Sequence, residues 1–259
     1  MPTMNAHRSA IAWLNSWWQL LQFAALLLTR ALAPSSYRRD NRRMLSEQIV
    51  IATTVNLVWF SVLCALISLI IIRIVVVTSA SYGLSRYALE MVVRVLVLEL
   101  VPLTAALFVA LRTTLPAGVE FAQQRIAGNA PDARAALRTQ FYPRAAAGVF
   151  AVWMLAAVSC LLTLVLAYLV MYGFTPWALP GYTRVVGQIF NPAVCLILAL
   201  KVVFFSLAVA VIPLASSYYS SATSPLLRRI GAAHGLADMV RMFSVILVVE
   251  AASLMGNYY

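Results

Sequence analysis

The chain has 259 residues, of which 63% are hydrophobic and 10% charged, and its mean hydropathy is +0.89. A soluble globule of this length needs far more polar residues at its surface, so the composition excludes that class and predicts an integral membrane protein. The net charge of +11 does not indicate a nucleic-acid partner, because no basic stripe with interleaved aromatic residues accompanies it.

The first predicted element is a helix over residues 10–33. Asn15, Gln19 and Gln22 recur at helical spacing and share one face, and tryptophans suited to the headgroup level lie nearby. We therefore expect an amphipathic helix that lies in the cytoplasmic membrane interface. A signal peptide cleaved after residues 31–33 is the alternative, and the four arginines that follow directly oppose it.

Five apolar runs follow, each near the roughly 20 residues that a helix needs to cross about 30 Å of hydrocarbon. They predict five transmembrane helices, at about residues 51–77, 91–111, 145–172, 189–215 and 240–256. The expected fold is thus an all-α integral membrane protein, with the interfacial helix and five spans forming one domain over residues 1–259.

The basic residues predict the orientation of these spans. Most of the 19 Lys and Arg lie before the first span or in the segments after the second and fourth. By the positive-inside rule the N-terminus is cytoplasmic and the C-terminus periplasmic. Residues 113–143 then form the longest cytoplasmic loop, and Gly128 and Pro131 suggest two short helices joined at a turn.

The sequence contains little that points to catalysis. It has no glycine-rich phosphate loop ending in Lys-Ser or Lys-Thr, and its one lysine, Lys201, lies in the middle of a span. Two histidines are too few for a zinc site. Cys64, Cys160 and Cys195 all lie in apolar runs, where cysteine behaves as a small hydrophobe. We expect no enzyme activity, no metal and no cofactor on this chain.

Ionisable residues inside the spans are the strongest functional signal. Each costs about 2.5–3.5 kcal/mol to insert unless it is paired or hydrated. Helical rise and the predicted topology place Glu99, Lys201 and Glu250 in the outer half of the membrane or near its midplane. The interpretation stays open between structural pairs that fix helix register and the lining of a substrate site. Pro102 predicts a kink in the second span.

The run LELVPLTAALFVALR, Leu98–Arg112, resembles the MlaE/YrbE permeases of ABC-type lipid transporters that work with MCE-domain proteins. In that family an acidic residue lies three positions before a proline, an arginine ends the span ten positions after it, and a glutamate follows. Glu99, Pro102, Arg112 and Glu120 fit this spacing. Further similar segments are YPR at 142–144, KVVFFSLAVAVIP at 201–213 and VILVVEAASL at 245–254.

The resemblance implies a permease subunit of an ATP-driven phospholipid transporter in the bacterial inner membrane. Its implied partners are an ABC ATPase that holds ATP and magnesium, an MCE-domain protein on the periplasmic face, and a second permease copy or paralogue. The residues expected to line the lipid cavity are Glu99, Pro102, Lys201 and Glu250. The residues expected to couple the chain to the ATPase are Arg112, Glu120, Arg125, Asp132 and Arg134.

Two other functions remain open from the sequence. The segment RIAGNAPDARAAL is shorter than its counterpart in the family and carries Pro131, which favours a scaffold subunit that anchors a complex without transporting. Glu99 or Glu250 would instead suit a proton-coupled secondary transporter, which needs no ATPase.

Overall fold

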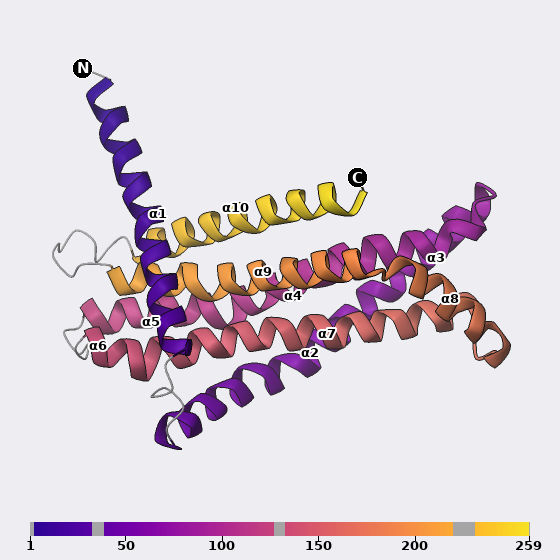
Figure 1. Ribbon diagram of the computed structural model, residues 1–259, viewed down its shortest axis with the longest axis horizontal. Helices are drawn as coiled ribbons and strands as arrows, with labels where there is room; N and C mark the ends of the chain where they lie inside the picture. Colours follow the sequence, from indigo (N-terminus) through magenta and orange to yellow (C-terminus); the bar gives the residue numbers. More distant parts are fainter. Residues whose placement is uncertain (1–2, 33–38, 127–132, 220–230, 259) are drawn as a thin grey trace.

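The computed structural model describes residues 3–32, 39–126, 133–219 and 231–258, and these segments are helical apart from short turns (Figure 1). Five helical stretches are long and apolar enough to cross a membrane. The all-α prediction and the number of candidate spans are therefore confirmed. We refer to them as spans one to five: Leu45–Ser81, Ala88–Phe121, Leu137–Tyr172, Pro192–Tyr219 and Leu236–Asn257.

The α-helices are α1 (Thr3–Leu32), α2 (Arg39–Ser81), α3 (Ala88–Met91), α4 (Val101–Val109), α5 (Leu115–Ile126), α6 (Ala133–Ala136), α7 (Tyr142–Tyr172), α8 (Leu179–Ile189), α9 (Pro192–Tyr219) and α10 (Gly231–Tyr258). Three π-helical stretches, Val92–Leu100, Ala110–Thr114 and Leu137–Phe141, continue these helices, and 3₁₀ turns occur at Ser85–Tyr87 and Pro176–Ala178. Helices satisfy their backbone hydrogen bonds internally, which a chain in the hydrocarbon core needs because no water is available there.

Span two does not end where the sequence suggested. Helical backbone continues without a break from Ala88 through Arg112 to Ile126, so much of the expected loop over residues 113–143 is an extension of the span. Arg112 does not stop a helix, because arginine has high helix propensity and its long side chain reaches polar surroundings from a helical backbone. The expected turn at Gly128 and Pro131 lies outside the described residues.

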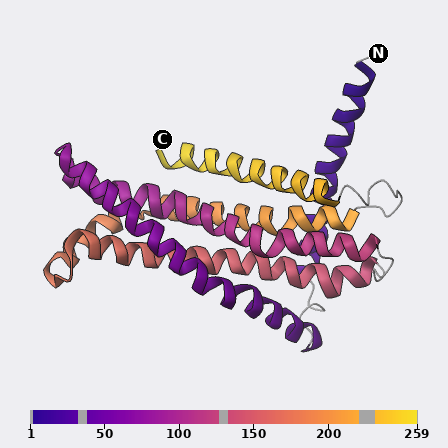
Figure 2. The same ribbon diagram turned by 180° about the vertical axis from the view of Figure 1, so that it is seen from behind.

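Spans two, three and four form the centre of the bundle. α9 packs against α7, α4 and α10, and α2 packs mainly on α7, crossing the bundle diagonally (Figure 2). The main core lies where α4, α7 and α9 meet, and small residues such as Ala105, Ala151 and Ala210 let these helices approach closely. α10 lies along one side and leaves most of its surface uncovered by this chain.

α1 runs across the end of the bundle that carries α5 and α6 (Figure 1). Leu20, Phe23 and Leu27 are buried against α7 and α9, while Gln19 and Gln22 are exposed. α1 is thus a helix with one face on the protein and polar residues on another. Its location in the membrane interface stays a prediction.

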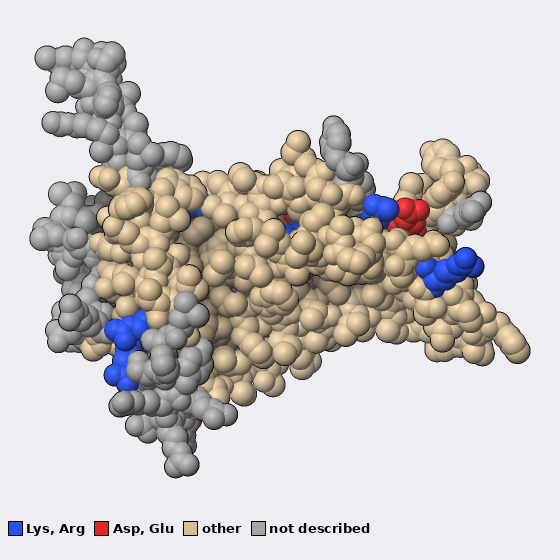
Figure 3. All heavy atoms as spheres, in the orientation of Figure 1, with Lys and Arg blue, Asp and Glu red and all other residues tan. Residues whose placement is uncertain are grey.

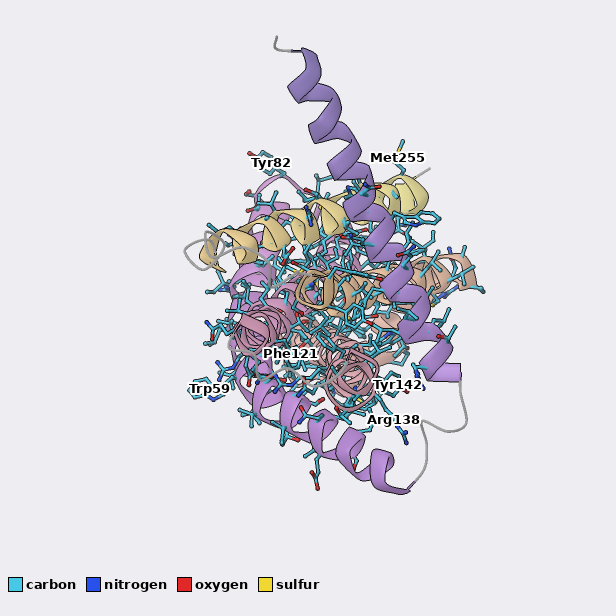
Figure 4. All side chains as sticks on the ribbon, turned by 90° about the vertical axis from the view of Figure 1, so that its left-hand side faces the viewer. Trp59, Tyr82, Phe121, Arg138, Tyr142 and Met255 are labelled. Atoms are coloured by element: carbon cyan, nitrogen blue, oxygen red, sulfur yellow. The ribbon has the colours of Figure 1, made fainter. Side chains whose placement is uncertain are left out.

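The same end of the molecule holds an aromatic cluster built from four elements. Phe23 of α1, Phe121 of α5 and Tyr218 of α9 surround Phe141, with ring centroids 4.7–6.0 Å from that ring. Figure 4 views this end and shows Phe121 inside the bundle, whereas Trp59 and Met255 point away from it. The cluster ties the crossing helix to spans two, three and four.

Charged atoms are scarce on the surface of the bundle. In Figure 3 they gather toward the two ends of the molecule, and a small patch of mixed sign is visible in the middle of an otherwise apolar face. Exposed aliphatic side chains cover α2 and α10 along most of their lengths. This pattern is expected for helices whose outer surface meets lipid.

Candidate functional site

Three charged side chains from three different spans meet inside the bundle. Lys201 of α9 forms ion pairs with Glu99, which lies on the π-helical stretch before α4, and with Glu250 of α10. The Lys201 Nζ atom lies 2.8 Å from Glu250 Oε2. Lys201 is 2% exposed and Glu99 8%, so burial within the bundle strengthens the attraction between them. We call these residues the charged cluster.

The charged cluster is held by further polar contacts. Asn257, two turns after Glu250 on α10, donates an Nδ2 hydrogen bond of 2.9 Å to Glu99 Oε1. The Lys201 ammonium also lies 5.7 Å from the centre of the Phe205 ring, one turn further along α9, within cation–π range. Both carboxylate oxygens of Glu99 therefore accept a bond from a different span.

Pro102 contributes an acceptor to the cluster. A helical residue at position 102 would donate its N–H to the carbonyl of Leu98, four residues back, but proline has no N–H. Lys201 Nζ donates to this Leu98 carbonyl at 3.2 Å. The proline thus leaves a backbone oxygen for a lysine on another helix, and the kink expected at this position stays a prediction.

The π-helical pattern opens a second carbonyl beside the first. Val101 donates its N–H to Leu96 O, five residues back, so the next bond of that pattern would join Pro102 to Val97 O. Cys160 Sγ of α7 lies in donor position, 3.6 Å from Val97 O. The two carbonyls that an N–H at position 102 could reach, one in the α pattern and one in the π pattern, therefore accept side-chain bonds from spans four and three.

The charged cluster lies at one depth in the bundle. We measured each depth along the helix axis from the helix end that lies away from α5 and α6. Glu99 lies about 17 Å along span two, Lys201 about 14 Å along α9 and Glu250 about 12 Å along α10. The sequence predicted similar depths for these residues. Their meeting at one point is what the structure adds.

Of the predicted coupling residues, Glu120 has the clearest contacts. Along the continuous helix it lies about 12 Å from Arg112, the other residue expected at the root of the coupling loop, and the coupling role of both stays a prediction. Glu120 Oε2 lies 3.4 Å from Arg144 Nη1 of α7, and Gln124 donates to Glu120 Oε1 at 3.4 Å. Arg112 is exposed and forms no ion pair with any other described residue.

The other three predicted coupling residues are less well placed. Arg125 lies on α5 and Arg134 on α6, but the side chains of both are outside what the structure describes. Asp132 lies in the segment 127–132, also outside the described residues.

Two residues of these sites were missed by the sequence analysis. Asn257 follows Glu250 by seven residues, a spacing that places both on one helical face and was available in the sequence. Arg144 belongs to the noted YPR segment, yet its partner is 24 residues away and no local pattern indicates it. Arg144 also stacks over the Phe121 ring at 5.3 Å.

A separate apolar cavity of about 220 Å³ lies between α2 and span two. It is lined by Phe60, Leu63, Cys64, Ile67, Ser68, Leu96, Leu100, Val101, Thr104, Leu107 and Phe108. Its lining is almost entirely apolar, so it suits an apolar group such as a lipid chain. Within the described residues, no group of His, Cys, Asp and Glu is arranged to hold a metal ion.

The family model for permease MlaE matches residues 45–255, which is most of the chain. The chain belongs to the MlaE permease family. It is accordingly a multi-pass membrane protein and a permease component of an ABC-type lipid transporter, as the resemblance implied. No curated protein sequence matches it significantly.

The MlaE match includes all three residues of the charged cluster and the Glu120–Arg144 pair. It begins near the start of span one, so α1 lies outside it, and it ends two residues before Asn257. The MlaE permeases are transport proteins, not enzymes.

Proposed function

We propose that this chain is the transmembrane permease subunit of an ATP-driven phospholipid transporter in the bacterial inner membrane. In this proposal an ABC ATPase binds ATP and magnesium below the membrane, an MCE-domain protein lies on the periplasmic face, and a second permease copy or paralogue completes the lipid cavity. Membership of the MlaE family supports the class of transporter. The observation that carries the proposal is the charged cluster, which joins spans two, four and five.

The position of the cluster suits a lipid substrate. Phospholipid headgroups are charged and their chains are apolar, and the cluster is a charged site inside an apolar bundle. In the predicted orientation it lies in the outer half of the membrane, where a periplasmic lipid donor or acceptor would work. Glu99, Lys201 and Glu250 then face or brace the lipid headgroup, while Pro102 fixes the Leu98 carbonyl beside them.

The packing of α5 gives a route from the ATPase to this site. Gly118 of α5 lies so close to α9 that an added Cβ would be 2.8 Å from Pro213 O. Pro213 and Lys201 lie on the same helix, so a displacement of α5 is passed to the helix that carries the lysine. Nucleotide binding would supply the free energy that biases the cavity between two states.

The test is purification of the tagged chain from its native membranes, followed by mass spectrometry and reconstitution of the complex in liposomes. We expect an ABC ATPase and an MCE-domain protein to co-purify, and a labelled phospholipid to move only when ATP is hydrolysed. Transport driven by a pH gradient without ATP would replace this proposal by a proton-coupled transporter. A complex without an ATPase and without transport would replace it by a scaffold.

A further inference from the structure

The Lys201 ammonium is already surrounded by oxygen atoms of the protein, two of which accept its hydrogen bonds. A lysine ammonium has three N–H donors. Three oxygens surround Lys201 Nζ: Leu98 O at 3.2 Å, a Glu99 carboxylate oxygen, and Glu250 Oε2 at 2.8 Å. A phosphate group could bind this ammonium only by displacing one of these oxygens. Lys201 therefore offers no open site to an anion.

Acceptors, by contrast, are in excess on the side of the cluster that α10 forms. Ser253 Oγ and Asn257 Oδ1 are buried and have no hydrogen-bond partner among the described residues, and Glu250 Oε2, although ion-paired with Lys201, has none either. Ser253 as a whole is only 7% exposed. Glu250, Ser253 and Asn257 are spaced three and four residues apart, so they share one face of α10. Buried acceptors without donors are costly, and a ligand that supplies N–H groups removes that cost.

The net charge of the cluster also favours a ligand that supplies N–H groups and is positively charged. Two carboxylates face one ammonium, and Lys201 is the only basic residue that pairs with either of them in the described part of the chain. The Glu250 side chain is 14% exposed and Asn257 is partly exposed, whereas the Lys201 side chain is 1% exposed. A ligand that approaches along α10 therefore meets a carboxylate and an amide before it meets the lysine.

We propose that the charged cluster recognises the primary ammonium group of an aminophospholipid, and not the phosphate group of the headgroup. This inference rests on the proposed function and names its substrate class. The ammonium would lie against the face of α10, with its N–H groups directed at the Glu250 carboxylate, Ser253 Oγ and Asn257 Oδ1. Phosphate and chains would extend away from the cluster.

The test compares lipids that differ only in the headgroup. The purified full-length complex is equilibrated with mixtures of phosphatidylethanolamine, phosphatidylcholine and phosphatidylglycerol of identical chains, and retained lipids are counted by native mass spectrometry. We expect phosphatidylethanolamine to be retained roughly tenfold over the other two, as hydrogen bonds to a charged group imply. Equal retention, or preference for phosphatidylglycerol, would overturn the proposal.

Two variants make the comparison specific to α10. Glu250→Gln removes the negative charge and should bring the retention ratio close to one. Ser253→Ala removes an acceptor that has no partner, so the fold should be retained while the preference falls several-fold. Ser244→Ala on the same helix is the matched control, because its hydroxyl already donates to Val240 O, and it should leave the ratio unchanged. An unchanged ratio in both Glu250→Gln and Ser253→Ala would contradict the assignment.

A further arm separates a lipid from a soluble amine. Free ethanolamine at the same concentration as the lipid should not displace phosphatidylethanolamine, and displacement would show that the cluster takes the amine alone. ATP-driven transport of all three lipids without preference would overturn this inference and leave the proposed function standing. A phosphatidylethanolamine preference without ATP-driven transport would support this inference and overturn the proposed function.

Discussion

Lys201 determines whether two carboxylates can stay inside the bundle. A buried carboxylate is tolerated when it is paired and hydrogen-bonded, and a single ammonium serves both Glu99 and Glu250. The Leu98 carbonyl, which Pro102 cannot serve with an N–H, accepts a hydrogen bond from the same ammonium. The contacts of Glu99, Pro102, Lys201 and Glu250 therefore depend on one another. The changes in stability caused by substituting them one at a time will not add.

We expect Lys201→Met to lower the free energy of unfolding by about 3–5 kcal/mol, because it leaves two buried carboxylates without a cation. The measurement is thermal unfolding of the purified protein in detergent. The matched control is the triple variant Glu99→Gln, Lys201→Met, Glu250→Gln, which keeps the shapes and removes all the charges. It should recover most of the lost stability. A single variant as stable as the parent would show that the ion pairs contribute nothing.

For single residues, the sequence predicted roughly how deep in the membrane each side chain lies, but not which neighbouring helix it faces. Counting helical rise placed Glu99, Lys201 and Glu250 at similar levels, yet periodicity cannot say which faces of three helices meet. The role of Pro102 was predicted only as a kink, because the use of a freed carbonyl depends on a donor about 100 residues away in the chain. Arg144, the ion-pair partner of Glu120, could not be predicted because it lies 24 residues away on another helix.

α5 and α9 approach each other closely at the end of the bundle where α1 crosses. Glycine at position 118 permits this approach, since the Pro213 carbonyl occupies the space of a side chain. The aromatic cluster around Phe141 lies beside this contact and joins the same helices. The two features tie α5 to α9 by direct contact, as the proposed coupling route requires.

Gly118→Ala should therefore weaken the link between ATP hydrolysis and lipid transport. The new Cβ would force α5 from α9, at a cost of about 1–3 kcal/mol, although alanine is otherwise the better helix former. We expect a lower unfolding temperature and fewer lipids moved per ATP. Gly187→Ala in α8 is the control, because nothing lies within 4 Å of its added Cβ. Equal coupling ratios in the two variants would remove α5 from the route.

The extent of α5 shows the limit of element prediction from this sequence. The apolar run ends near Leu111, so hydropathy placed the end of span two there. The backbone stays helical for another fifteen residues because contacts with α9 and α10 stabilise the polar turns, and Ala117 and Phe121 are buried there. Tertiary packing, which a periodicity pattern does not contain, decided this boundary.

For the whole molecule, a mean hydropathy of +0.89 was enough to predict a membrane protein, and the lengths of the separate apolar runs predicted the five spans. Orientation rests on the distribution of arginines. Arg112, Arg138 and Arg144 lie toward the end that carries α5 and α6, which the positive-inside rule assigns to the cytoplasm.

Single cysteines test this orientation directly. In a background with Cys64, Cys160 and Cys195 changed to alanine, we place one cysteine at Ser85, in the turn between spans one and two, or at Thr139, near the start of span three. Both positions are exposed. A membrane-impermeant maleimide should label Ser85→Cys in spheroplasts and Thr139→Cys only after permeabilisation. The opposite pattern would invert the topology and place the charged cluster in the inner half.

The spans differ in length, and this affects the surrounding bilayer. Span one has 37 residues and span five has 22, lengths of about 55 Å and 33 Å. Even tilted by 40°, span one would cover about 42 Å along the membrane normal, more than the hydrocarbon thickness of about 30 Å. Beside α2 the bilayer must therefore be thicker, or the ends of α2 must protrude from it. Beside α10 the bilayer needs no such change. The bilayer should be thinner along α10, which lowers the headgroups there toward Glu250.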